Sequence, residues 1–154
     1  MAIIIGSITD VLLKWLLKLK RYPFTAILSL ITILILYEAF DDPIMVIKGF
    51  LFAQVLIFAG FYDTKVKIIP DTVHFLIIAI SIININPVHA IAGLLAGFLP
   101  FLLVGIVCGG IGGADIKLMG ASGLVLGCWG VMAASVLGLT IALIKNKFIN
   151  KDCY

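Results

Sequence analysis

Five long apolar stretches, separated by short polar breaks, make up most of this chain. They are Phe24–Phe40, Ile44–Tyr62, Thr72–Ile85, Val88–Cys108 and Ile116–Ile144. A helix needs about 20 predominantly apolar residues to cross the hydrocarbon core of a bilayer, and fewer where the bilayer is thin or flanking side chains reach the interface. The first, second and fourth stretches meet this length, and the third is short. The pattern predicts an all-α, polytopic membrane protein.

Composition supports this fold class and narrows the partners. Hydrophobic residues make up 63% of the 154 residues and charged residues 12%, whereas soluble domains are about half apolar and a quarter charged. The lipid bilayer is therefore the expected solvent. The formal net charge of +3 is too small to indicate nucleic-acid binding, and membrane topology explains the basic residues better.

The positions of the basic residues indicate how often the chain crosses the membrane. Cytoplasmic loops of membrane proteins are enriched in Lys and Arg. Six crossings place ten of the eleven basic residues on the cytoplasmic side, whereas five would leave the tail lysines outside. We therefore expect six transmembrane helices in the cytoplasmic membrane, with both termini cytoplasmic. The ten residues are Lys14, Lys18, Lys20, Arg21, Lys65, Lys67, Lys117, Lys145, Lys147 and Lys151, and Lys48 lies near the opposite side.

The last apolar stretch has to divide if the chain crosses six times. A turn near Cys128–Gly130 gives spans over 116–127 and 129–144. The first of these covers only ~18 Å, at about 1.5 Å per residue. We therefore expect the glycine-rich loop before Asp115 to dip into the membrane, where irregular backbone is tolerated if protein buries it or it lines a wet cavity.

The N-terminal region differs from the rest. Apolar and charged residues separate onto two faces over residues 7–21, which predicts an amphipathic helix lying on the membrane surface. We therefore divide the chain into an interfacial segment, residues 1–22, and a six-helix membrane domain, residues 23–154. The three cysteines, Cys108, Cys128 and Cys153, form no metal-ligand spacing with the histidines. No metal or organic cofactor is implied.

Small residues recur at the spacing that lets membrane helices pack closely. The pairs are Gly93 with Gly97, Gly105 with Gly109, and Gly123 with Gly127. Close helix contact is the expected role of these glycines.

Two aspartates carry the chemistry that the sequence suggests. Asp63 follows the second apolar stretch, and Asp115 precedes the last one. An ionisable group at membrane depth is costly and marks a candidate functional site. On a six-span topology both acids lie on the cytoplasmic side, where two close carboxylates would share one proton, as in an aspartic protease dyad. The helix dipole favours charge on Asp115 and opposes charge on Asp63, so we expect the shared proton on Asp63.

Other readings remain open for these and neighbouring residues. The two acids could simply cap helices, and Asp71, which follows Pro70, fits a helix N-cap. Lys65, Lys67 and Lys117 fit topology anchors, although Lys117 could also tune the charge of Asp115. His74 fits a hydrogen-bonded packing residue better than a ligand.

The context of the two acids resembles a known family. Residues 63–71, with the sequence DTKVKIIPD, are similar to the first motif of type IV prepilin peptidases and archaeal preflagellin peptidases. Residues 112–118, GGADIKL, with Gly120 and Gly123, resemble their second, GxGD-type motif. The resemblance covers roughly residues 44–144. Those enzymes are membrane aspartic endopeptidases that cut the basic leader from pilin-like precursors at the cytoplasmic face.

By this resemblance Asp63 and Asp115 are the catalytic pair, and a prepilin-like protein with a basic leader is the substrate. We expect six further residues to support catalysis or substrate binding: Gly112, Gly113, Lys117, Pro70, Asp71 and Lys65. Ala114 stands where the motif has its second glycine, so Gly112 and Gly113 are expected to supply the backbone freedom. The chain lacks the paired C-x-x-C motifs of the methylating members, which predicts leader cleavage without methyl transfer.

Two other functions remain possible from the sequence. Paired intramembrane carboxylates also serve proton relays, so the chain could be a small proton-coupled transporter. It could also be an inactive subunit of a pilus or secretion assembly. The oligomeric state, the source and the natural substrate stay open.

Overall fold

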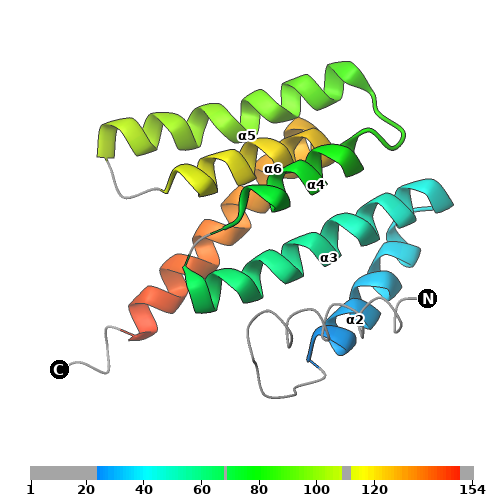
Figure 1. Cartoon of the computed structure of the whole chain (residues 1–154), viewed down its shortest axis with the longest axis horizontal. Coiled ribbons are helices and arrows are strands. Elements are labelled where there is room, and N and C mark those ends of the chain that lie inside the picture. The colour runs from blue at the N-terminus through cyan, green and yellow to red at the C-terminus, as the bar shows by residue number, and fades with distance from the viewer. Residues whose placement is uncertain (1–23, 68, 109–111, 150–154) are drawn as a thin grey trace. The chain divides into compact units, whose positions relative to one another are not determined.

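The computed structural model describes residues 24–67, 69–108 and 112–149, and all five elements within them are helices (Figure 1). They are α2 (Phe24–Ala39), α3 (Pro43–Val66), α4 (Asp71–Ser81), α5 (Pro87–Cys108) and α6 (Gly113–Ile149). The expected all-α class is confirmed for these residues. Helices α2 to α4 belong to one compact unit and α5 and α6 to another. The interfacial segment expected at residues 1–22 lies outside the described residues.

Local capping signals explain where two of the helices begin. The Asp42 side chain accepts a hydrogen bond from Ile44 N (3.0 Å), and Pro43 occupies the first turn of α3. Asn86 caps the start of α5 in the same way, because its Oδ1 accepts a hydrogen bond from His89 N (3.5 Å). Proline is suited to the first turn of a helix because its missing N–H has no intrahelical partner there. The breaks predicted at both places are confirmed.

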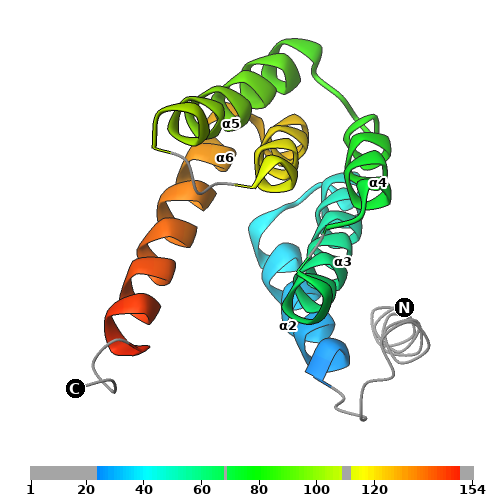
Figure 2. The same cartoon turned by 60° about the vertical axis from the view of Figure 1, so that its left-hand side comes forward.

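Helix α6 is interrupted at Gly127, which has φ 71° and ψ 179°. This combination is accessible essentially only to glycine, and α6 changes direction there (Figures 1 and 2). The break falls one residue before the turn expected at Cys128–Gly130. The length of the last apolar stretch and the pattern of basic residues therefore predicted the position of its division to within one residue. The two segments meet without an intervening loop.

Helix length supports membrane crossing for three of the described helices. The apolar segments Pro43–Thr64, Pro87–Val107 and Gly113–Ala142 have 22, 21 and 30 residues. The shorter segments Ile27–Ala39 and Asp71–Ser81 are also apolar. Three candidate spans indicate a membrane protein, whereas the six-span topology stays a prediction.

The distribution of side chains is the reverse of that in a soluble protein. Large aliphatic and aromatic residues are exposed on every described helix, including Leu34, Ile47, Phe75, Val107 and Trp129. Several polar side chains are buried instead: Thr25, Ser29, Lys48, Gln54, His74, Ser81 and Ser122. An apolar surface of this extent is suited to contact with lipid rather than water.

Polar contacts join the helices of the first unit. Between α2 and α3, the buried Ser29 hydroxyl donates to Gln54 Oε1 (3.0 Å). Between α3 and α4, Lys48 Nζ donates to the backbone oxygen of Ser81 (3.3 Å). Because lipid is as apolar as a leucine side chain, helix pairing in a membrane depends on close packing and on such interhelical hydrogen bonds.

Glycines allow the two helices of the second unit to pack closely. A Cβ on Gly93 would collide with the backbone oxygen of Gly123, and a Cβ on Gly123 would collide with that of Gly93. Gly97 faces the Met119 backbone in the same way. Helices α5 and α6 therefore approach each other closely enough to exclude side chains at these positions. The packing role expected of Gly93, Gly97 and Gly123 is confirmed.

Candidate active site

Asp63 lies in the last turn of α3 with an exposed side chain. Asp63 lies at the C-terminal end of a helix, as expected, and the helix continues to Val66, beyond the end of the apolar stretch at Tyr62. Its backbone oxygen accepts a hydrogen bond from Lys67 N (2.8 Å), which closes the helix. The carboxylate is therefore held on a regular turn at the negative end of the α3 dipole.

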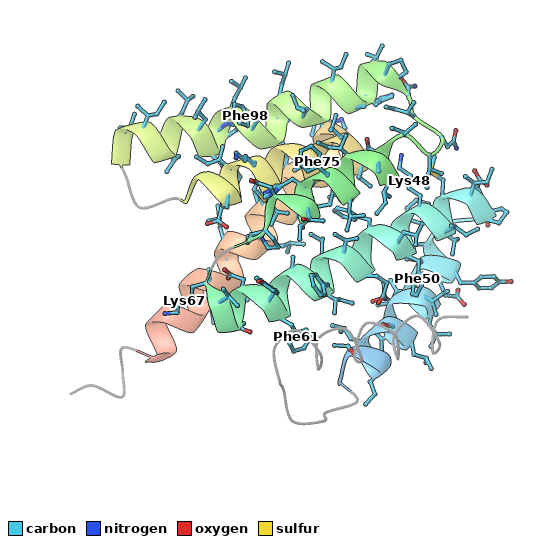
Figure 3. All side chains as sticks on the ribbon, in the orientation of Figure 1. Lys48, Phe50, Phe61, Lys67, Phe75 and Phe98 are labelled. Carbon is cyan, nitrogen blue, oxygen red and sulfur yellow. The ribbon has the colours of Figure 1, made fainter. Side chains whose placement is uncertain are left out.

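Lys67 ends α3 in the left-handed conformation, with φ 55° and ψ 29°. This conformation is usual for glycine at a helix C-terminus and costs an L-residue roughly 1–2 kcal/mol. Lys67 is exposed at the end of α3 (Figure 3). The chain turns there toward Pro70 and α4. Lys65 lies in the same last turn of α3.

Asp71 is the first residue of α4, and Pro70 occupies the N-cap position. The expected N-cap role of Asp71 is therefore wrong by one residue, because α4 begins directly after the proline. Asp71 still favours the helix, since a carboxylate in the first turn interacts well with the dipole. Its Oδ1 lies 3.8 Å from Nδ1 of the buried His74, one turn further on. Pro70 and Asp71 thus lie in the connection that follows the Asp63 turn.

Asp115 lies in the first turn of α6 with an exposed side chain. The N–H groups of Asp115 and Ile116 donate to Gly112 O (3.0 and 3.2 Å), which starts the helix. A Cβ on Gly112 would stand 3.2 Å from Asp115 Oδ2, so the carboxylate folds back over the start of its own helix. There it lies at the positive end of the α6 dipole.

The structure assigns the two glycines different roles. Gly112 leaves room for the Asp115 carboxylate, whereas a Cβ on Gly113 would meet nothing within 4 Å. Neither has a positive φ, since Gly127 is the glycine with that geometry among the described residues. The expectation that both supply unusual backbone freedom is therefore not met. Ala114 replaces the motif glycine without strain because it lies within regular helix.

Lys117 follows Asp115 in the first turns of α6 and is exposed. The candidate residues therefore form two groups, each at a helix end. Asp63, Lys65, Pro70 and Asp71 lie around the α3–α4 connection, and Gly112, Gly113, Asp115 and Lys117 lie at the start of α6. The first group belongs to one compact unit and the second to the other.

The region matched in a comparison with protein families covers both groups of residues. The model of the type IV leader peptidase family matches residues 50–145, from α3 to α6, which is well over half of the chain. The chain belongs to the type IV leader peptidase family. The matched region includes Asp63, Asp71 and Asp115, and the resemblance found in the sequence is confirmed. No curated protein and no solved structure matches the chain.

Membership in this family agrees with the structure. The described residues include three helices long and apolar enough to cross a bilayer, and these helices together with the family indicate a membrane protein. A peptidase needs groups that activate water and polarise a peptide carbonyl. The exposed carboxylates at the helix ends are residues of the required type.

Proposed function

We propose that this leader peptidase is a membrane aspartic endopeptidase with Asp63 and Asp115 as its catalytic pair. It cleaves the basic leader of prepilin-like or archaellin-like precursors at the cytoplasmic face of the cell membrane. The proposal rests on a feature that the two acids share, namely their location near the end of a helix. Each is exposed, lies within one turn of a helix end, and falls inside the region matched by the family.

The chemistry needs one carboxylate in each protonation state. The ionised carboxylate takes a proton from a water molecule, whose oxygen attacks the carbonyl carbon of the scissile peptide. The protonated carboxylate gives its proton to the carbonyl oxygen, which forms a tetrahedral gem-diol intermediate. The first carboxylate then passes the proton that it took from water to the leaving nitrogen, the C–N bond breaks, and the second carboxylate takes back a proton from a hydroxyl of the intermediate. Two carboxylates that share one proton supply both states without a metal.

The helix ends support a division of labour between the acids. In this proposal the roles follow from the two helix ends, since Asp115 lies at the positive end of the α6 dipole and Asp63 at the negative end of the α3 dipole. Asp115 is then the group that accepts the proton of water, and Asp63 donates to the peptide carbonyl.

Neighbouring residues support the pair in this proposal. Gly112 makes room for the Asp115 carboxylate, and Gly113 is the first residue of α6. Pro70 and Asp71 set the path from α3 into α4. Lys65 and Lys117 hold the two helix ends at the cytoplasmic interface, where anionic lipids attract basic side chains and basic leaders alike. Six crossings with both termini in the cytoplasm complete the topology.

The transporter alternative is less well supported. A proton relay through the membrane calls for acids near the bilayer midplane. Every acidic residue in the part of the chain that the structure describes lies in a loop or within about one turn of a helix end. The alternative of an inactive assembly subunit is decided by activity.

The test is cleavage of a pilin-type precursor by the protein reconstituted in liposomes. Mass spectrometry of the product should show release of the basic leader. Asp63→Asn and Asp115→Asn should each abolish cleavage while the protein remains folded, and Asp41→Asn, at an exposed acid between α2 and α3, should cleave normally. Wild-type rates in either catalytic variant would rule out the pair. The same product spectrum reports whether a methyl group is added.

A further inference from the structure

Lys48 is a buried cation that the proposed chemistry does not use. It lies on α3 within the apolar segment Pro43–Thr64, and its relative exposure is only 7%. A lysine in a membrane helix normally extends its ammonium group to the interface. Here the ammonium group donates instead to the backbone oxygen of Ser81, at 3.3 Å. Figure 3 labels Lys48 on α3.

Ser81 is the last residue of α4, and the hydrogen bonds at this end of the helix explain the contact. The last four carbonyls of a helix have no intrahelical N–H partner. Three of the four in α4 find donors on their own chain segment. The Ser81 hydroxyl donates to Ile78 O (2.6 Å), and the N–H groups of Ile82 and Ile83 donate to Ala79 O (3.3 Å) and Ile80 O (3.1 Å).

The fourth carbonyl, that of Ser81, receives its donor from another helix. Without water, an unpaired carbonyl at membrane depth costs several kcal/mol. A positive charge at a helix C-terminus is also favoured by the dipole. Lys48 thus satisfies the carbonyl of Ser81 and ties the end of α4 to the second turn of α3.

The tie matters because α4 is short. Its 11 residues span about 16 Å at 1.5 Å per residue, less than the hydrocarbon core of a bilayer. Length therefore does not fix its depth, and contacts with α3 must do so. One end of α4 is held through the connection that carries Pro70 and Asp71, and Lys48 holds the other end.

We propose that Lys48 is a positioning residue that fixes α4 along α3 and thereby holds the Pro70–Asp71 connection in place beside the Asp63 turn. Lys48 acts through α4 and does not touch the substrate. The inference for catalysis rests on the proposed function, whereas the inference for α4 does not. Lys48→Met, which removes the donor and the charge, should shift α4, and Lys48→Arg, which keeps both, should restore it.

The first measurement follows α4 without reference to activity. Thr72, in the first turn of α4, is exposed, so Thr72→Cys in a background with the native cysteines replaced by alanine provides a labelling site. The rate of its reaction with a soluble maleimide in liposomes reports the depth of this turn. Loss of one charged hydrogen bond corresponds to roughly a tenfold change in an equilibrium. Lys48→Met should therefore change the labelling rate at least threefold, and Lys48→Arg should not.

The second measurement is cleavage of a pilin-type precursor. Lys48→Met should lower kcat about tenfold with KM within twofold of wild type, since it disturbs the site and not the leader contacts. Ser81→Ala is the matched control. It removes a hydrogen bond at the same end of α4 but leaves the contact between helices, so both readouts should stay near wild type.

The outcomes separate the two claims. Wild-type labelling in Lys48→Met overturns the role in holding α4, and shifted labelling with unchanged kcat overturns the role in positioning the site. If wild-type protein cleaves no precursor, the proposed function fails, while labelling still decides what Lys48 does to α4. If Lys48→Met does not accumulate in membranes, Lys48→Gln is measured against Lys48→Arg in its place, with the same expected differences.

Discussion

The Asp115 carboxylate lies directly over Gly112, so that a Cβ on this glycine would stand 3.2 Å from Asp115 Oδ2. That distance is tighter than an ordinary van der Waals contact, so a methyl group there has to displace the carboxylate by a few tenths of an ångström. The carboxylate can therefore lie over the start of α6 because Gly112 has no side chain, and the helix dipole favours this position.

Gly112→Ala should lower kcat for leader cleavage roughly tenfold, equivalent to about 1.4 kcal/mol. Gly113→Ala is the matched control, because its Cβ would meet nothing within 4 Å, and it should keep kcat within about twofold, the spread expected of a surface substitution. Steady-state kinetics in liposomes measures both variants. Equal loss in the two would mean that loop flexibility, and not room for the carboxylate, is what the glycines provide.

The close approach of α5 and α6 predicts a large effect on stability. Gly93→Ala and Gly123→Ala each place a methyl group against a backbone oxygen of the partner helix, which cannot move aside alone. Each should destabilise the protein by about 3 kcal/mol or more, at the upper end of overpacking costs. Thermal unfolding in detergent gives the comparison.

Gly138→Ala serves as the control for that experiment. A Cβ on Gly138, which lies on α6, would meet no other described atom within 4 Å, so alanine should be neutral or stabilise the protein by up to about 1 kcal/mol. A drop in unfolding temperature as large as that of Gly93→Ala would show that α6 tolerates no added methyl group, and the contact with α5 would not be the cause.

The left-handed Lys67 predicts a gain from glycine. Lys67→Gly and Lys67→Ala both remove the side chain, but only glycine adopts φ 55° without strain. Lys67→Gly should be more stable than Lys67→Ala by about 1 kcal/mol. Chemical denaturation of the two variants in matched micelles measures the difference. An alanine variant as stable as the glycine variant would place the end of α3 in a different conformation.

The hydrogen bond between Ser29 and Gln54 predicts that replacing one residue changes stability differently from replacing the other. Ser29 also donates to Thr25 O (2.7 Å), so Gln54→Leu leaves the hydroxyl paired. The substitution also removes Nε2, a buried atom that has no hydrogen-bond partner among the described residues. Gln54→Leu should therefore be neutral or stabilising. Ser29→Ala should cost about 1 kcal/mol, because Gln54 Oε1 then loses its donor.

A double-mutant cycle on these two residues checks the interpretation. The double variant, Ser29→Ala with Gln54→Leu, should recover stability relative to Ser29→Ala alone, since no buried polar atom of the pair remains. A strongly destabilised Gln54→Leu, by more than about 2 kcal/mol, would mean that the amide makes contacts beyond Ser29.

Local signals explain which parts of this fold could be predicted. Asp42-Pro43 and Asn86-Pro87 are capping sequences, and the helices begin where they indicate. The end of α3 was harder to predict from the sequence, because no glycine follows the helix and Lys67 takes the left-handed position instead. Asp63 was expected at the C-terminal end of this helix, where it lies, but the three helical residues that follow it were not expected.

Long-range contacts explain the rest. Glycine spacing predicted that the helices pack closely, but the pairing of Gly93 with Gly123 depends on the fold of α5 against α6. Lys48 was assigned to the opposite side of the membrane as a lone exception to the charge pattern. Its pairing with Ser81 O depends on where α4 ends, which its uniformly apolar sequence does not reveal.

The central claim is that Asp63 and Asp115 act on one water molecule as a pair. Crosslinking of Asp63→Cys with Asp115→Cys, in membranes and in a background with the native cysteines replaced by alanine, tests it most directly. The account predicts rapid crosslinking by a short bifunctional thiol reagent, whereas the control pair, Asp41→Cys with Asp115→Cys, should remain unlinked. If the cysteine-free parent protein cleaves its precursor but no crosslink forms between positions 63 and 115, the claim is contradicted.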